Sequence, residues 1–155
     1  MKFRTLVILA LSIMLPAAAV AQDPVLTVTE PELGTWEFTG LVAAPIALGV
    51  PSEYGLEFGW LGDASGYGGT ILGYRYGWDI VDPDNPFDPG WTTPGYVVDL
   101  LAAPTISFTH GEHSLHVEVA DTAGGLTRAW FTLQIAPPVA VEARTWGAVK
   151  TLFGR

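Results

Sequence analysis

HSLHVEVADTAGGLTRAWFTLQI, residues 113–135, is the stretch that decides the fold of this chain. Apolar and polar residues alternate before the central turn, and a second alternation follows it, so both halves have the period of half-buried strands. Gly124 and Gly125 can adopt the positive φ that a tight reversal needs. The stretch therefore predicts a β-hairpin with one apolar face, which needs a second sheet to cover it.

The alternation also predicts which side chains of the hairpin face the core. The expected inward residues share one parity on each strand: Leu115, Val117, Val119, Ala129, Phe131, Leu133 and Ile135. The expected outward residues lie between them: His116, Glu118, Arg128, Trp130, Thr132 and Gln134. Pro137 and Pro138 then end the ladder, because proline donates no N–H.

The first 21 residues have the features of a secretory signal peptide. Lys2 and Arg4 supply a positive start, residues 6–15 form an apolar run, and Ala19 and Ala21 place small residues before a cleavage at Gln22. An uncleaved anchor is the alternative, but the apolar run is short for a membrane span. We therefore expect an exported chain of residues 22–155, without a transmembrane segment after cleavage, that is secreted, periplasmic or on the cell surface.

The composition narrows the class of protein further. There is no cysteine, which excludes a disulfide framework and a lipid-modified N-terminal cysteine. Small exported domains of eukaryotes usually carry disulfides, so we expect a bacterial protein. Without the signal, five basic and sixteen acidic residues remain, a net charge of −11. This charge disfavours nucleic acid and anionic membrane as partners and suits solubility or cation binding.

Short strands are also predicted between the signal peptide and the hairpin. Strand-like patterns occupy residues 25–29, 35–39, 56–60, 71–79, 96–102 and 105–108, and residues 41–51 form an irregular crossing with room for one short strand. A Gly-rich loop spans residues 62–69, and an acidic, Pro-rich loop spans residues 80–90. Seven or eight short strands without an internal helix predict an all-β fold, an Ig-like antiparallel β-sandwich over residues 22–136.

Three blocks of this pattern resemble extracellular Ig-like modules. The blocks are GYRYGWD at 73–79 followed by Trp91, FTHGEHSLHVEVADTAG at 108–124, and FTLQIAPP at 131–138. They resemble the pattern of the Y-Y-Y domain and of PKD-like and fibronectin-III-like repeats, over residues 56–136. The resemblance implies a sandwich used as a spacer or binding module, and its motifs carry packing rather than ligand chemistry. The loop between Asp79 and Trp91 is longer and more acidic than that pattern.

The acidic loop is the main candidate for metal binding. Asp79, Asp82, Asp84 and Asp88, with Asn85, place hard oxygen ligands within ten residues, as Ca²⁺ prefers. They lack the Asp-x-Asp-x-Asp-Gly order, and prolines interrupt the loop. We expect a solvated turn that does not need calcium, and no cofactor.

Catalytic motifs are missing from the sequence. It contains no Gly-x-Ser-x-Gly and no His-Glu-x-x-His. His110, His113 and His116 are three apart, which on a strand sends neighbours to opposite faces and disfavours a zinc site. A glycosidase carboxylate pair needs a cleft, which a small sandwich with short loops does not readily supply. We expect no enzymatic activity.

The main functional hypothesis is an exported, non-enzymatic module with a structural, adhesive or ligand-binding role. Its partner would be an extracellular or envelope protein or a glycan. The alternative is a carbohydrate-binding module, which would use Trp130 and Trp91 as exposed aromatic residues. A small exported hydrolase is a third hypothesis.

Residues 137–155 form a linker and a C-terminal tail. Four apolar residues of the tail share one face of a predicted short helix: Trp146, Val149, Leu152 and Phe153. Arg144, Lys150 and Arg155 make the tail basic, whereas the body is acidic. Three interpretations remain open: an end that docks weakly on its own sandwich, a sorting or anchoring signal like the short tails of exported bacterial proteins, or a partner-binding helix.

Overall fold

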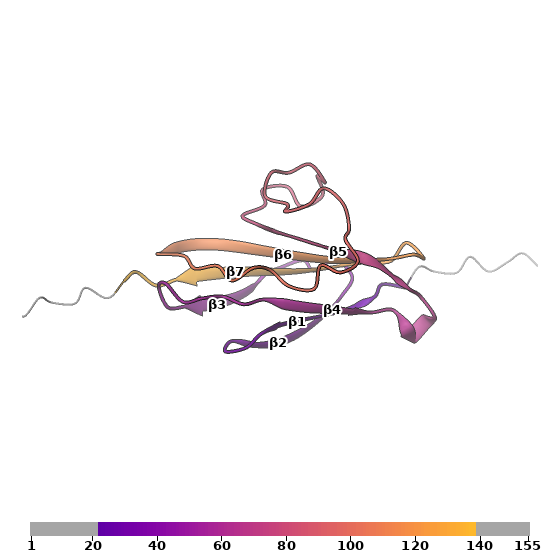
Figure 1. Ribbon diagram of the computed structural model, residues 1–155, viewed down its shortest axis with the longest axis horizontal. Coiled ribbons are helices and arrows are strands. Elements are labelled where there is room, and N and C mark those ends of the chain that lie inside the picture. Colours follow the sequence, from indigo (N-terminus) through magenta and orange to yellow (C-terminus); the bar gives the residue numbers. More distant parts are fainter. Residues whose placement is uncertain (1–21, 139–155) are drawn as a thin grey trace, which may run out of the picture.

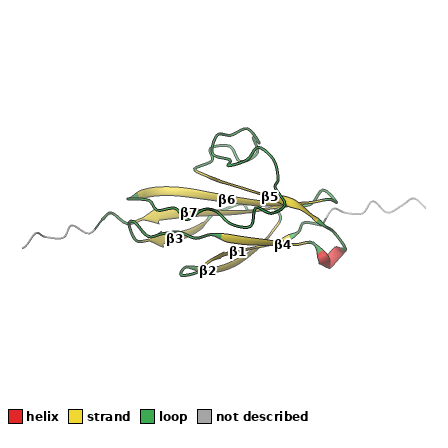
Figure 2. Ribbon diagram, in the orientation of Figure 1, coloured by secondary structure: helices red, strands yellow, loops and turns green. Residues whose placement is uncertain are grey.

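Two β-sheets face one another across an apolar core in the computed structural model, which describes residues 22–138 (Figure 1). One sheet has three strands in the order β2-β1-β4, and the other has four in the order β3-β7-β6-β5. The strands are β1 Val25–Glu30, β2 Gly34–Thr39, β3 Ile46–Val50, β4 Gly59–Asp63, β5 Ile71–Trp78, β6 Gly111–Asp121 and β7 Leu126–Ile135. Loops and one short 3-10 helix, Ser65–Tyr67, join them, so the described chain is all-β, as predicted (Figure 2).

β6 and β7 form the predicted hairpin and occupy the centre of the four-stranded sheet. The register places Leu115 opposite Phe131 and Val117 opposite Ala129, and all four side chains are buried. The parity of the two strands is therefore the one that the alternation predicts. The inward faces of both strands are apolar and buried, so the hairpin forms one side of the hydrophobic core.

The turn between β6 and β7 is held by the strand that precedes it. The Asp121 carboxylate accepts hydrogen bonds from the amides of Ala123 and Gly125 at 2.9 and 2.7 Å. Gly124 has a φ of +91°, the positive value that the sequence predicts for this reversal. The turn is therefore fixed by a short-range side-chain cap, which also fixes the register of the hairpin.

β3 is the one short strand within residues 41–51, and it pairs in parallel with β7. The expectation of an antiparallel sandwich is therefore wrong for this strand pair, because the chain changes sheets before β3 and enters the second sheet in the direction of β7. Ile46 lies opposite Phe131 and Val50 opposite Ile135. The chain therefore crosses from the three-stranded sheet to the far edge of the four-stranded sheet between β2 and β3. As a result, β7 is an interior strand, with β3 on one side and β6 on the other.

The strands predicted at 96–102 and 105–108 are reduced to isolated bridges. Val97 forms a bridge with Tyr74 of β5, and Ile106 forms one with Leu56, ahead of β4. Pro104 donates no N–H, which limits how far a ladder can extend here. The segment still covers the open edge of β5 and then that of β4, so it links the two sheets.

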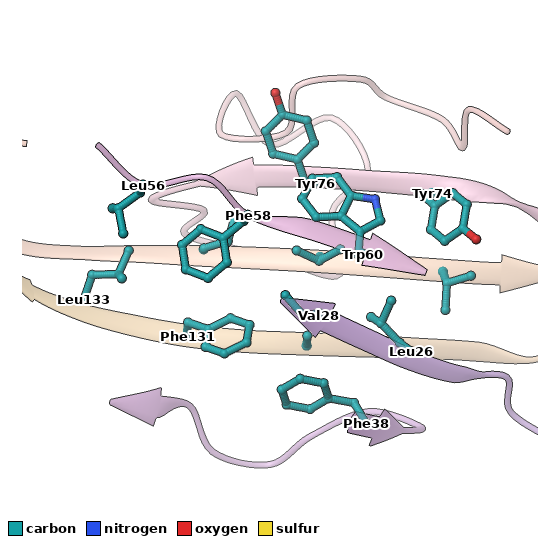
Figure 3. Close-up of a cluster of buried hydrophobic side chains, with 14 of the residues drawn as sticks. Leu26, Val28, Phe38, Leu56, Phe58, Trp60, Tyr74, Tyr76, Phe131 and Leu133 are labelled. Atoms are coloured by element: carbon teal, nitrogen blue, oxygen red, sulfur yellow. The ribbon is translucent and has the colours of Figure 1, made fainter. Parts of the chain in front are cut away.

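Phe131 lies at the centre of the core. Its ring centroid is 5.0 Å from that of Trp36, 5.5 Å from that of Phe38 and 5.6 Å from that of Phe58. Figure 3 shows Phe131 between the strands of the two sheets. Other buried core residues are Leu26, Val28, Leu56, Trp60, Tyr74, Tyr76, Leu115, Val117, Val119 and Leu133. Both sheets therefore contribute aromatic and aliphatic side chains to one continuous core.

Two predicted segments lie outside the described residues, namely the signal peptide at 1–21 and most of the tail, at 139–155. Within residues 22–138, the structure contains no helix with the length and apolar character needed to span a bilayer.

Candidate functional site

The loop after β5 folds over the outer face of the four-stranded sheet, the face turned away from the core (Figure 1). We call residues 79–91 the strap. It returns to the sheet where Trp91 forms a bridge with Gly77 of β5. A Cβ atom on Gly77 would lie 2.3 Å from the Gly90 carbonyl oxygen, so only glycine admits this approach. The acidic loop is therefore an added layer over the sheet.

Three charged side chains lie side by side beneath the strap, one on each of β5, β6 and β7. The register places Arg75 opposite Glu118 and Glu118 opposite Arg128. Arg75 Nε donates to Glu118 Oε2 at 2.5 Å, and Arg128 Nε donates to Glu118 Oε1 at 2.6 Å. Glu118 is 0% exposed, and the two arginines are 6% and 9% exposed. The three residues form a buried ion cluster in which two guanidinium groups share one carboxylate.

Tyr96 completes the coordination of the buried carboxylate. Its hydroxyl donates to Glu118 Oε2 at 2.9 Å. Burial, reinforced by the negative charge of Glu118, raises the pKa of Tyr96 to about 12. The phenol therefore stays protonated at neutral pH and remains a hydrogen-bond donor to the cluster.

The two arginines also hold the strap in place. Arg128 Nη2 donates to the Pro83 carbonyl at 3.0 Å and to the Asp84 carboxylate at 2.9 Å. The guanidinium carbon of Arg75 lies 4.0 Å from the ring centroid of Trp91, a cation–π geometry. Each arginine thus binds Glu118 and the strap at the same time.

Hydrogen bonds within the strap give it an internal order. The Asp88 carboxylate accepts from the amides of Asp82 and Gly90 at 3.0 and 2.8 Å. These amides, first that of Gly90 and then that of Asp82, hold the pKa of Asp88 below its usual range. The Trp91 indole donates to the Asn85 carbonyl at 3.1 Å. The strap therefore folds on its own side chains as well as on the sheet.

The four carboxylates considered as calcium ligands accept hydrogen bonds from the strap itself or from the sheet beneath it. Asp79 accepts the Ser114 amide at 2.8 Å, and Asp82 accepts the Asp84 amide at 3.2 Å. Asp84 and Asp88 have the partners described above. Among residues 22–138, no group of three or more Asp, Glu, His or Cys is placed to hold a metal ion. The strap thus places its acidic side chains as acceptors for the chain itself.

The two tryptophans predicted as binding residues lie on this same outer face, with His116 between them. The ring centroids of Trp91 and His116 are 6.4 Å apart, and His116 stacks on Trp130 at 5.3 Å with an interplanar angle of 19°. Trp91 is 7% exposed, and Trp130 is half-buried. The structure brings the two together, but as a covered row of rings rather than as exposed aromatic residues.

The histidines of the hairpin do not converge. The ring of His113 stacks on Phe108 at 3.8 Å and forms a 2.9 Å hydrogen bond with Asp79. His116, on the opposite face of β6, is 3% exposed. Burial, and secondarily the charge of Arg128, lowers the pKa of His116 to about 4. His116 is therefore a neutral component of the covered face at neutral pH.

The strap also presents apolar side chains to solvent. Val81 is 90% exposed and Phe87 is 81% exposed. Asp82 and Asp84, both exposed, lie in the chain between them. All four residues belong to the strap, which Arg75 and Arg128 hold on the sheet. Phe87 and Val81 are the two most exposed large apolar side chains of residues 22–138.

The sequence interpretation missed this ion cluster, although part of the signal is present. The turn at 122–125 fixes the register that sets Glu118 opposite Arg128, and Arg75 alternates with inward tyrosines. Opposite charges at facing positions on three strands could therefore have been inferred. The burial of these charges could not be inferred from the sequence, because it depends on where the strap folds.

Comparisons with known proteins identify no relative: no family model, no curated protein and no solved structure matches this chain.

Four tail residues predicted to interact lie outside the described residues: Trp146, Val149, Leu152 and Phe153. The strap and the face beneath it are therefore the features from which a function can be inferred.

Proposed function

We propose that this chain is an exported, non-enzymatic β-sandwich module of the Ig-like kind, with a structural or adhesive role, that binds a protein partner through the strap. The observation that carries this proposal is the anchoring of the strap by Arg75 and Arg128, which leaves Val81 and Phe87 outside. A loop already ordered in the free protein loses little conformational entropy on binding. The export part of the proposal rests on residues 1–21.

The charge around the strap indicates the chemistry of the partner. The exposed residues Asp82 and Asp84 lie in the chain between the exposed apolar residues Val81 and Phe87. Such a surface fits an apolar patch with a basic rim, since apolar contact supplies affinity and opposite charge supplies orientation and a faster encounter.

The carbohydrate-binding alternative receives less support. Sugar-binding faces use aromatic rings that a sugar can stack on, whereas Trp91 is 7% exposed and packs against Arg75. The hydrolase hypothesis also receives less support. Glu118 accepts hydrogen bonds from two arginines, and Asp88 accepts hydrogen bonds from two backbone amides.

Binding to isolated cell envelopes of the source organism tests the proposal. The fluorescently labelled chain from Gln22 onward should bind, and the double variant Val81→Ser plus Phe87→Ser should lose this binding. Leu61→Ser plus Leu72→Ser is the matched control, since Leu61 and Leu72 are 62% and 49% exposed and lie outside the strap. Equal binding by both double variants would remove the strap from the interface. A glycan-array signal lost in Trp130→Ala would support the carbohydrate alternative instead.

A further inference from the structure

Positive and negative charge are segregated along this chain. The described residues 22–138 contain fifteen acidic residues but only two arginines, and both arginines are buried against Glu118. No lysine or arginine of residues 22–138 is therefore exposed on their surface. The bases that follow the predicted signal peptide, other than these two, are Arg144, Lys150 and Arg155. The cationic side chains of the exported chain are thus concentrated in its last residues.

The strap offers both kinds of contact that those residues would need. Val81 and Phe87 provide exposed apolar surface, and the Asp84 side chain is 80% exposed even though it binds Arg128. The sequence after residue 138 contains the complementary set: Arg144, Trp146, Val149, Lys150, Leu152, Phe153 and Arg155. The strap and this part of the sequence both combine apolar residues with charged ones, and the charges are of opposite sign.

We propose that residues 139–155 dock on the strap of the same chain, with the apolar tail residues against Val81 and Phe87 and the tail bases beside the strap carboxylates. The proposal rests on the strap being a binding surface, as in the proposed function, and names the occupant of that surface in the free protein. The docked tail covers the residues that a partner would contact, so it acts as an autoinhibitory segment. A partner then has to displace the tail, which reduces its apparent affinity.

The tail is long enough to reach the strap. Arg128, which binds Pro83 and Asp84, lies seven positions before Ile135, the last residue of β7. Seven residues of strand correspond to about 23 Å at 3.3 Å each. Residues 136–155 can span about 66 Å when extended. The chain can therefore turn back along the outer face, and the tether keeps the tail at about millimolar effective concentration near the strap.

A single spin label on the tail tests the contact. The chain has no cysteine, so Ala148→Cys in the chain from Gln22 to Arg155 gives one labelling site. With a nitroxide there, the strap amides, including those of Val81, Asp84 and Phe87, should lose NMR intensity, while those of β2 on the other sheet should not. The loss should weaken in about 0.5 M NaCl, because salt screens exposed charges.

Matched variants and mixtures make the test decisive. Val81→Ser plus Phe87→Ser should abolish the intensity loss at the strap, whereas Leu61→Ser should retain it. Intensity loss away from the strap, or none at all, would overturn the proposal. So would loss seen only when a labelled chain is mixed with a ¹⁵N-labelled unmodified chain, which would indicate a second copy, or tail binding seen only with phosphatidylglycerol vesicles. A docked tail without envelope binding would leave this inference standing and reject the proposed function.

Discussion

At the scale of single residues, Glu118 is the buried carboxylate that pairs with both arginines of the described structure. It is 0% exposed and accepts hydrogen bonds from Arg75, Arg128 and Tyr96. Both arginines also hold the strap. Removing the charge of Glu118 would therefore leave the buried Arg75 without a carboxylate partner and Arg128 with only the exposed Asp84.

We expect Glu118→Gln to lower the free energy of unfolding by about 3–5 kcal/mol, because breaking one side of a buried ion cluster leaves uncompensated charge. Urea unfolding measures this loss. Glu37→Gln is the matched control, because Glu37 is exposed on β2 and its change should have little effect. Equal losses at the two positions would mean that the cluster contributes no more than surface charge does.

The lowered pKa of His116 predicts how the free energy of unfolding depends on pH. Its pKa falls from 6.5 to about 4 on folding, so the folded state resists protonation. The neutral ring's contribution to the free energy of unfolding is complete above pH 6.5 and is lost as pH falls from 6.5 towards 4. At pH 5 the loss of stability relative to neutral pH is about 2 kcal/mol. Asp88, Glu118 and Arg128 face this ring electrostatically.

Unfolding free energies measured between pH 7 and pH 5 test this dependence. His116→Phe should flatten the slope in that window. Below the window the carboxylates with lowered pKa values, Asp63, Asp88 and Asp121, contribute as well, so measurements there do not isolate His116. A slope unchanged by the substitution would assign the effect to other groups.

At the scale of elements, the hairpin of β6 and β7 determines the inside and outside of the fold. Phe131 is 0% exposed among three aromatic rings, whereas Trp130 is half-buried on the outer face. Phe131→Ala should therefore cost about 3–5 kcal/mol of stability, through lost burial and a cavity. Trp130→Ala should cost clearly less in the same denaturant titration. Similar losses would contradict the register.

The strap depends on the glycine beneath it. Gly77→Ala would place a Cβ 2.3 Å from the Gly90 carbonyl oxygen, so either the strap or β5 must move. We expect a lower melting temperature and a changed environment of the Trp91 ring in near-UV circular dichroism. Gly95→Ala, where a Cβ meets nothing within 4 Å, is the control and should leave both unchanged. An unaltered Gly77→Ala spectrum would mean that the strap does not lie on β5.

These elements also show what a sequence reveals and what it does not. The faces of Val117 and Phe131 were predictable, because period two is a local property of each strand. The same period accounts for the burial of Leu56, Phe58 and Trp60, which stand at alternate positions. The burial of Glu118 was not predictable, because it depends on the strap, which lies 27 to 39 positions earlier in the chain and folds over this face of the sheet. The residue pattern at 105–108 likewise could not distinguish a strand from the isolated bridge that Ile106 forms.

At the scale of the whole molecule, repulsion between like charges is the dominant long-range term. Fifteen acidic residues and two buried arginines within residues 22–138 leave a surface of one sign. Screening this repulsion should stabilise the compact state, so the melting temperature should rise from low salt to about 0.5 M NaCl.

Calcium distinguishes general screening from a specific site. CaCl₂ and NaCl at equal ionic strength should give coinciding melts, and EGTA should have no effect, because the strap carboxylates already have partners from the chain. An additional rise with Ca²⁺ that Asp84→Asn removes would establish a calcium site in the strap.

The parallel pairing of β3 with β7 has a kinetic consequence. Ile46 and Phe131 are neighbours in the sheet although 85 positions separate them in the chain. Such a topology has a high contact order, which slows folding to about milliseconds to seconds. During synthesis from the N-terminus, β3 cannot pair with β7 until β7 has been made. The β1–β2 hairpin alone has only marginal stability in water. The four-stranded sheet therefore cannot be completed before β7 is available to pair with both β3 and β6, which makes its closure a late step of folding.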